Sequence, residues 1–243
     1  MEALTCRLLP YASADGPTNM ATDEALLVSA QAGQATLRFY GWSEPTLSLG
    51  YFQPAAVRLS DPLLANLPFV RRMTGGDTLV HHHELTYALA LPPRWVQVAT
   101  WPQRMHEIIA AALATFGITA RLQQGNCGPR EPGPLCFRHV TCGDLMIGEH
   151  KVVGSAMRKS RGAILQHGGI LMAGSPKTPN LPGIKELAGQ VLSEASLRVG
   201  IVETFGILLR AHFEERCLSP EEGLLMDDVA RSKYALGTWN LKR

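Results

Sequence analysis

Residues 151 to 171, KVVGSAMRKSRGAILQHGGIL, predict two strands at the centre of a β-sheet. KVVGSAM and AILQHGGILM, which runs on to Met172, are short apolar runs bounded by glycine and charged residues, a pattern typical of strands. Just before them, DLMI lies across Gly148 and Glu149 from Lys151, and this spacing predicts a hairpin. Lys151 is therefore expected to lie at the start of a strand.

Helical and strand patterns extend outward from this stretch. Residues 17–32, with Pro17 in the first turn, and residues 101–116, followed by Gly117, repeat apolar residues at helical spacing. A later apolar stripe predicts a helix that ends near Cys217. Two earlier runs, ATLRFY and TLSLGYF, predict strands joined by a turn. Strands and helices without strict alternation predict an α+β fold whose helices pack on one side of the sheets.

The composition is that of an ordinary globular protein and predicts one domain. The chain has 243 residues, of which 46% are hydrophobic and 18% are charged. This length and composition allow a sizeable core. The formal net charge is only +2 and no polybasic run occurs, so nucleic acid is not an expected partner.

The N-terminus and the cysteines predict a soluble protein of the cytoplasm. No basic segment followed by an apolar stretch begins the chain, and no run of about eighteen apolar residues occurs. Neither a signal peptide nor a membrane partner is therefore expected. The five cysteines are an odd number without a CxxC pair, which favours neither a disulfide framework nor a structural zinc site.

Cys136 and Lys151 form the candidate reactive pair. Cys136 lies in PLCF, directly after the Gly- and Pro-rich residues 125–133, and Lys151 follows it fifteen residues later. A lone cysteine is more often a small buried hydrophobic residue than a nucleophile. The loop position and the lysine raise Cys136 above the other four cysteines as a candidate nucleophile, because a cation favours the thiolate and the thiolate is the nucleophilic form. From these residues alone, both interpretations remain open.

A pair of glycines follows a pair of arginines earlier in the chain. Thr74, Gly75 and Gly76 come shortly after Arg71 and Arg72. Adjacent glycines either form a plain hairpin turn or let backbone N–H groups approach a carbonyl or phosphate group. Both interpretations remain open from these residues alone.

Three consecutive histidines, His81 to His83, raise the question of a metal site, because imidazole is a common metal ligand. In a strand, however, His81 and His83 point to one face and His82 to the other, so this run cannot supply three converging ligands. No metal site is therefore predicted. His81 is either a pocket residue or a half-buried strand residue bonded to the backbone.

Taken in order, these motifs resemble the biotin/lipoate A/B protein ligase family, which contains lipoate-protein ligases and octanoyltransferases. The similar blocks include RFYGWSEPTLSLGYFQ (38–53), VRRMTGGDTLVHHHELTYALALP (70–92), PLCF, KVVGSA and LQHG. The resemblance extends from about Asn19 to near Trp239. The spacing of the cysteine before the lysine strand resembles the cysteine-dependent octanoyltransferase branch, whereas Asp77 and Thr78 depart from the family pattern.

The resemblance implies a fold and a set of site residues. The fold is an α+β single catalytic domain over residues 1–243, with a central mixed β-sheet flanked by helices, like class II aminoacyl-tRNA synthetases and biotin ligases, and no C-terminal accessory domain. Cys136 would accept the acyl group, and Lys151 would contact the acyl carbonyl and favour the thiolate. The substrate pocket would contain Arg71, Arg72, Gly75, Gly76, His81, Gly154, Ser155, Ala156, Gln166 and His167. From the residues alone, 154–156 and 166–167 could equally reflect sheet or core packing.

The implied function is octanoyl transfer in lipoate biosynthesis and protein lipoylation. The octanoyl group would pass from octanoyl-acyl carrier protein to Cys136 as a thioester, then to a lysine of a lipoyl carrier domain, in glycine cleavage H protein or a 2-oxoacid dehydrogenase acyltransferase subunit. A thiol suits this route because a covalent intermediate divides the transfer into two easier steps, and no cofactor is expected. Two alternatives remain open: a lipoate-protein ligase that uses ATP and Mg²⁺ to form lipoyl-AMP, and a non-catalytic protein that binds acyl carriers.

Overall fold

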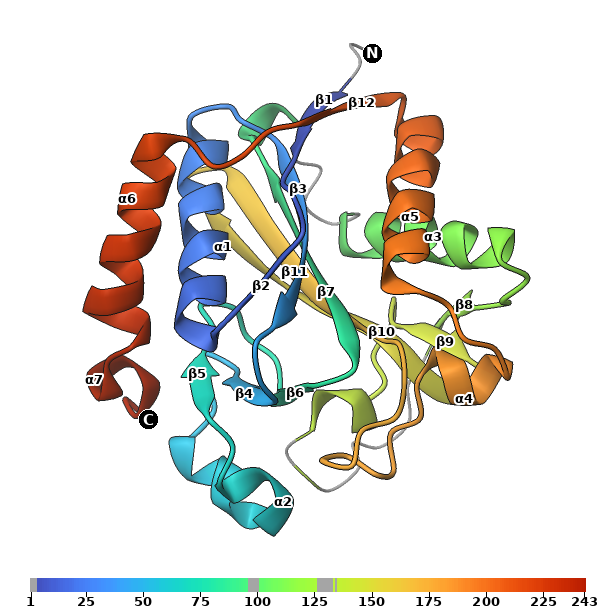
Figure 1. Ribbon diagram of the computed structural model, residues 1–243, viewed down its shortest axis with the longest axis horizontal. Helices are drawn as coiled ribbons and strands as arrows, with labels where there is room; N and C mark the ends of the chain where they lie inside the picture. Colours follow the sequence, from blue (N-terminus) through green and yellow to red (C-terminus); the bar gives the residue numbers. More distant parts are fainter. Residues whose placement is uncertain (1–3, 96–100, 126–132, 134) are drawn as a thin grey trace.

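A mixed β-sheet passes through the centre of the computed structural model, which describes residues 4–95, 101–125, 133 and 135–243 (Figure 1). Within these residues the sheet has nine strands, in the order β12-β1-β3-β7-β11-β10-β9-β8, with β2 paired to β3. Their bounds are β1 Leu4–Leu8, β2 Ala12–Ala14, β3 Thr36–Trp42, β7 Glu84–Leu91, β8 Arg121–Leu122, β9 Leu145–Ile147, β10 His150–Ser160, β11 Ala163–Leu171 and β12 Ala211–Glu215. A smaller sheet has the order β5-β4-β6 and contains β4 Thr46–Leu49, β5 Phe69–Arg71 and β6 Leu79–His81.

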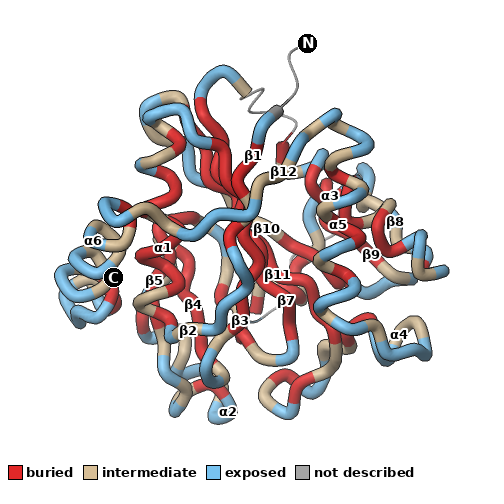
Figure 2. Tube along the Cα trace, turned by 45° about the horizontal axis from the view of Figure 1, so that its top comes forward, coloured by how far each residue is buried: buried red, intermediate tan, exposed pale blue. Residues whose placement is uncertain are grey.

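The strands predicted around residues 151–171 are confirmed. β10 begins one residue before Lys151, and its hairpin with β9 crosses Gly148 as expected. β10 pairs antiparallel with β11 so that Ala156 lies opposite His167, and β11 pairs with β7 so that His167 lies opposite Ala88. Every residue of β7 and β11 is buried, and Figure 2 shows this buried band in the middle of the molecule. Long apolar runs at these positions are typical of strands covered on both faces.

Helices cover both faces of the large sheet, so the prediction that they pack on one side is wrong. α3 (Trp101–Thr115) and α5 (Glu194–Leu209) lie on one side, and they pack against each other. α1 (Gly16–Gln31) lies on the other side and contacts β3, β7 and β11, with α6 (Pro220–Val229) packed outside it (Figure 1).

Helices can pack on both faces of the sheet because side chains alternate between the two faces along each strand. One set of positions belongs to the large core with α3 and α5, namely Leu37, Phe39, Tyr87 and Leu89. The intervening set belongs to the smaller core with α1, namely Tyr40, Ala88, Ala90 and Leu165. A sheet with apolar residues on both faces needs helices on both, which explains the error.

Two predicted helices are confirmed to within one residue at each end. α1 matches the expected range 17–32, and the Asp15 carboxylate accepts a hydrogen bond of 2.9 Å from the backbone N–H of Thr18 in its first turn. This is an N-cap, which satisfies an otherwise free donor at the helix start. α3 matches the expected range 101–116, and Gly117 follows it with a φ of +75°.

The third predicted helix ends earlier than expected. α5 stops at Leu209, and Arg210 adopts a left-handed conformation with φ of 50°. A left-handed residue does not continue a right-handed helix. The next residues form β12, which pairs in parallel with β1. The predicted continuation to near Cys217 is therefore wrong, because the backbone there bonds to the edge of the sheet.

The run TLSLGYF is a strand only in its first half. β4 ends at Leu49, and the chain turns at Gly50. A Cβ atom at Gly50 would lie 1.8 Å from the carbonyl oxygen of Gly76, so only glycine fits there. The turn after β4 thus lies directly against the glycine turn that follows β5.

Short helices complete the described part of the chain. They are α2 (Pro62–Ala65), α4 (Ile184–Ala188), α7 (Gly237–Asn240), the 3₁₀ helices Ala55–Ser60, Pro93–Trp95 and Cys136–Arg138, and a π-helical turn at Ala230–Tyr234. None of the helices in these ranges is long and apolar enough to cross a membrane. The Gly- and Pro-rich loop predicted at 125–133 falls mostly outside the described residues.

Candidate functional site

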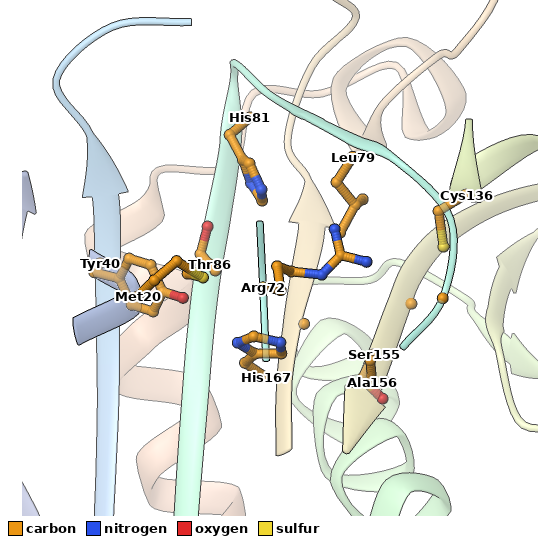
Figure 3. A pocket seen from close by; sticks show the side chains of 13 residues that line it. Met20, Tyr40, Arg72, Leu79, His81, Thr86, Cys136, Ser155, Ala156 and His167 are labelled. Carbon is orange, nitrogen blue, oxygen red and sulfur yellow. The ribbon is translucent and has the colours of Figure 1, made fainter. Parts of the chain in front are cut away.

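A pocket of about 420 Å³, including its open mouth, lies on the α1 side of the large sheet. Strand register places Tyr40, Thr86, Ala156 and His167 on this face. Figure 3 shows Cys136 and Met20 on opposite sides of the pocket, with His81, Arg72 and His167 between them. The described lining residues are Met20, Tyr40, Arg72, Gly76, Leu79, His81, Thr86, Cys136, Gly154, Ser155, Ala156, His167 and Gly168.

Cys136 begins a single turn of 3₁₀ helix and is partly buried. Its backbone N–H donates a hydrogen bond of 2.8 Å to the carbonyl oxygen of Thr78, and Leu135 forms a parallel β-bridge with Thr78. The cysteine segment is therefore fixed to the end of the glycine turn. Thr78, where the sequence departs from the family pattern, supplies this backbone contact.

Lys151 lies beside the cysteine, as predicted. Its Nζ atom is 3.7 Å from Cys136 Sγ and 3.3 Å from the Cys136 carbonyl oxygen. The lysine side chain is almost fully buried, with 3% of its surface exposed. A buried ammonium group at this distance stabilises a thiolate, because the local dielectric is lower than in water.

Asp144 is a neighbour of Lys151 that the sequence analysis did not identify. Its Oδ2 atom lies 2.8 Å from Lys151 Nζ, and its side chain is 6% exposed. The same oxygen accepts hydrogen bonds from the backbone N–H (2.7 Å) and the hydroxyl group (3.0 Å) of Thr141. The carboxylate thus orients the ammonium group toward Cys136. The hairpin register offered a signal, because Asp144 directly precedes β9, the partner strand of Lys151.

The absence of a side chain at Gly154 leaves space for the side chain of Lys151. A Cβ atom at this position would lie 2.6 Å from Lys151 Cε and 3.0 Å from Lys151 Nζ. The lysine side chain therefore crosses the strand directly over the glycine. This placement explains why one of the small residues predicted for the substrate pocket is a glycine.

Arg72 lies in the pocket wall and is only 2% exposed. Its Nη1 atom donates to the carbonyl and hydroxyl oxygens of Ser48, and its Nη2 atom donates to the carbonyl oxygens of Gly75 (3.1 Å) and Asp77 (2.8 Å). Burial lowers the pKa of Arg72, and the neighbouring Cys136 thiolate acts in the opposite direction. Arg72 and Cys136 both line the pocket.

His81 lies in the pocket wall within a buried polar chain. Its Nε2 atom is 2.6 Å from Ser48 Oγ, its Nδ1 atom bonds to a Glu84 carboxylate oxygen, and Trp42 stacks on its ring at 3.7 Å. Burial lowers the pKa of His81, and the Glu84 carboxylate partly offsets this effect. Ser48, Trp42 and Glu84 were not predicted as site residues.

The other two histidines of the run lie in the turn between β6 and β7. His82 Nδ1 is 2.8 Å from Ser175 Oγ, and His83, with φ of 58°, places Nδ1 2.9 Å from the Gly174 carbonyl oxygen. The expected strand alternation therefore stops at His81. In the described part of the chain, no group of three or more His, Cys, Asp or Glu residues is arranged to hold a metal ion.

His167 belongs to a second buried chain on the pocket side. Its Nε2 atom is 2.6 Å from Thr74 Oγ1 and its Nδ1 atom is 2.8 Å from Asp23 Oδ2. The Asp23 carboxylate also accepts from the hydroxyl of Tyr40 (3.0 Å) and pairs with Arg38 (3.1 Å). Asp23 was not predicted, although it lies on the apolar side of the predicted helix, where a carboxylate needs a partner.

Three predicted pocket residues lie elsewhere. Arg71 is fully buried, and its guanidinium group donates to the carbonyl oxygens of Gly50, Gln53 and Asn240, so it binds the C-terminal segment to the β4–β5 region. Gln166 is on the opposite face of β11 and donates to Tyr87 and Ser155. Gly75 lies in the glycine turn after β5 but is not among the described lining residues.

The remaining predicted residues are brought together. Gly76, His81, Gly154, Ser155, Ala156 and His167 all line the pocket with Arg72 and Cys136. The pocket is therefore an apolar space with a thiol at one side and cations near that thiol. Such an arrangement can hold an aliphatic chain while its carbonyl carbon meets the sulfur.

Residues 15–184 match the family model of the lipoyl protein ligase A/B catalytic domain. The chain is 32% identical to "Octanoyltransferase LipM" of Moorella thermoacetica and 30% identical to "Octanoyltransferase LipM" of Bacillus subtilis. In both cases the match covers 100% of each protein.

Solved structures of similar proteins share the fold. A lipoate-protein ligase A bound with ATP has a TM-score of 0.81 at 25% identity, over 99% of both chains. A bipartite lipoate protein ligase from Thermoplasma acidophilum has a TM-score of 0.77 at 22% identity, over 99% of this chain and 96% of that chain. The match extends along nearly the whole length of this chain.

Proposed function

The chain belongs to the lipoyl protein ligase A/B catalytic domain family, and on this premise we propose that it is an octanoyltransferase that carries the octanoyl group on Cys136. Relatives that it matches over their full length bear the octanoyltransferase name. The geometry of the pocket supports the proposed role of Cys136.

One observation carries the proposed role of Cys136. The thiol lies in the wall of an apolar pocket with a buried ammonium group 3.7 Å from its sulfur. A cation at this distance favours the thiolate, which is the nucleophilic form. By contrast, Cys6 lies in the core of the opposite face, where burial raises its pKa to about 12. Cys136 is thus placed to react with an acyl thioester, and Cys6 is not.

The first half-reaction is a thioester exchange. The Cys136 thiolate attacks the carbonyl carbon of the octanoyl thioester, and the C–O π pair moves onto the oxygen. When the C=O bond forms again, the bond to the carrier sulfur breaks and the carrier leaves as a thiolate, which takes a proton from water. The octanoyl group is then bound to Cys136 as a new thioester.

The second half-reaction transfers the acyl group to an amine. A neutral lysine ε-amine of the acceptor attacks the same carbonyl carbon, the C–S bond to Cys136 breaks, and the amine nitrogen loses a proton to solvent. Cys136 leaves as a thiolate beside Lys151, so the enzyme returns to its starting state. Neither half-reaction requires ATP or a metal ion, and we propose that no cofactor takes part.

The proposed partners are an acyl donor and a lipoyl domain. We infer octanoyl-acyl carrier protein as the donor, and glycine cleavage H protein or a 2-oxoacid dehydrogenase acyltransferase subunit as the acceptor. The first fits a thioester exchange, and the second supplies the lysine amine.

Intact-protein mass spectrometry tests this function directly. The protein is mixed with octanoyl-acyl carrier protein in the absence of ATP, and we expect an added mass of one octanoyl group that maps to Cys136. Addition of a lipoyl domain should move this mass to the domain. If no adduct forms without ATP, and octanoate is transferred only when ATP and Mg²⁺ are supplied, the protein is a ligase and the proposal is wrong.

A further inference from the structure

The donors of Lys151 are already engaged by protein oxygens. An ammonium group has three protons, and three oxygens lie within reach of Nζ: Asp144 Oδ2 at 2.8 Å, the His139 carbonyl at 3.0 Å and the Cys136 carbonyl at 3.3 Å. Its charge can favour the thiolate, but in this arrangement no proton is left for the oxygen of a bound acyl group. The family resemblance assigns Lys151 both tasks, and the geometry supports only one of them.

Arg72, unlike Lys151, has one N–H donor that lacks an acceptor among the described residues. A guanidinium group has five N–H donors. The terminal nitrogens of Arg72 make four hydrogen bonds, two to Ser48 and one each to the backbone of Gly75 and Asp77. Its Nε atom is buried and has no hydrogen-bond partner among the described residues. An unpaired buried donor is costly, so its presence in a pocket wall points to a ligand atom that accepts from it.

The acyl substrate offers one strong acceptor, its carbonyl oxygen. Figure 3 shows the Arg72 side chain extending across the pocket toward the Cys136 side. The four acceptors of its terminal nitrogens are neutral oxygens.

We propose that Arg72 is a catalytic residue whose Nε–H donates a hydrogen bond to the acyl carbonyl oxygen and stabilises the oxyanion in both half-reactions. This inference rests on the proposed function. As sulfur or amine attacks the carbonyl carbon, the oxygen gains the electron pair and negative charge that Nε–H and the guanidinium charge stabilise. When the C=O bond forms again, the pair returns and the C–S bond breaks. A preorganised donor in a water-poor site strengthens as charge develops.

The first experiment uses the wild-type protein. Octanoyl thioester labelled with ¹³C at the carbonyl carbon is loaded onto Cys136, and the carbonyl stretch is measured by isotope-edited infrared spectroscopy. A charged donor should lower its frequency relative to the same acyl-enzyme unfolded in urea. An identical frequency in the folded and unfolded proteins overturns the proposal.

The second experiment separates the oxyanion from the thiolate. Acylation of Cys136 passes through an oxyanion, whereas alkylation by iodoacetamide needs the thiolate alone. Arg72→Lys keeps a positive charge but removes Nε–H, so acylation should slow by about 10²–10³-fold, the usual cost of losing one oxyanion donor. The rate and pH profile of alkylation should remain as in the wild type.

Ser48→Ala is the matched control, because it removes one hydroxyl contact of Arg72 and leaves Nε–H in place. Its acylation rate should stay much closer to the wild type than that of Arg72→Lys. If Arg72→Lys slows alkylation as much as acylation, or Ser48→Ala slows acylation equally, Arg72 only supports the turn and the proposal is wrong. If Arg72→Lys does not fold, the infrared measurement decides. Absence of any wild-type adduct would instead contradict the proposed function.

Discussion

On β3, Leu37 and Phe39 belong to the apolar core with α3 and α5, whereas Arg38 and Tyr40 point to the other face and bond to Asp23 of α1. One strand therefore supplies packing on one side and positioned polar groups on the other. On β3, the apolar face buries Leu37 and Phe39, whose side chains need no hydrogen-bond partners. The pocket face buries charged and polar groups, whose desolvation is costly unless each is hydrogen-bonded.

This difference predicts two separate kinds of mutational effect. Changes on the apolar face should lower the free energy of unfolding and leave the chemistry of the folded enzyme intact. Changes at the pocket should alter transfer with smaller effects on stability.

The largest effect is expected for Cys136→Ser. A serine hydroxyl has no activating base here, because Lys151 is a cation held by Asp144, so octanoyl transfer should be abolished. The unfolding curve should remain close to the wild type. Cys6→Ala, on the apolar face, is the control and should retain the adduct in mass spectrometry. An adduct of the Cys136→Ser protein mapped to Cys142 would contradict the assignment.

Lys151→Ala should have the next largest effect. Loss of the ammonium group removes the charge that favours the thiolate, so alkylation of Cys136 by iodoacetamide should shift to higher pH. Octanoyl transfer at neutral pH should slow by about two orders of magnitude or more, within the range that an activating group contributes. Lys159→Ala, at an exposed position of the same strand, is the control. An unchanged alkylation profile would mean that Lys151 does not activate the thiol.

On the apolar face, Leu37→Ala tests stability alone. Removing a fully buried leucine side chain should lower the free energy of unfolding by about 2–5 kcal/mol, measured by urea denaturation. Tyr40→Phe on the other face of β3 loses one hydroxyl contact and should cost only about 1 kcal/mol. The comparison between the two faces fails if the transfer rate of the folded Leu37→Ala enzyme drops as far as that of a pocket variant.

Chain-length preference should show the most graded effect, with a small change for each methylene group. Each methylene group buried in the pocket contributes about 0.8 kcal/mol, or about fourfold in rate. Octanoyl should therefore be preferred over butanoyl by about two orders of magnitude. Ala156→Leu should shift the preference to shorter chains, measured with a series of acyl-carrier thioesters. Equal use of palmitoyl and octanoyl groups would show that Ala156 and the other small residues of the pocket wall serve packing only.

The sequence predicted β3, β9, β10, β11 and the first half of β4, two of the helices and the meeting of Cys136 with Lys151, because these depend on local patterns. Apolar runs and glycine positions were enough to place β10, β11, α1 and α3. The cysteine and lysine came together because a hairpin strand begins at the lysine.

What the sequence did not predict depends on contacts between distant segments. Asp23 and His167 are 144 positions apart, and the partner of β1 is β12 at the other end of the chain. Arg71 and Arg72 are neighbours in one strand region, yet one points into the pocket and the other to Asn240. Only the fold distinguishes them.

The contact between Gly154 and Lys151 has a consequence for selection and design. The atoms nearest to a methyl group at position 154 would be the flexible end of the lysine side chain and, farther away, a carboxylate oxygen of Asp144. The backbone could accept Gly154→Ala while the lysine turned away from the thiol. A screen for soluble, folded variants would therefore keep this substitution, whereas a screen for lipoylation would discard it. Position 154 thus offers a way to obtain a folded enzyme in which Lys151 no longer lies beside the thiol.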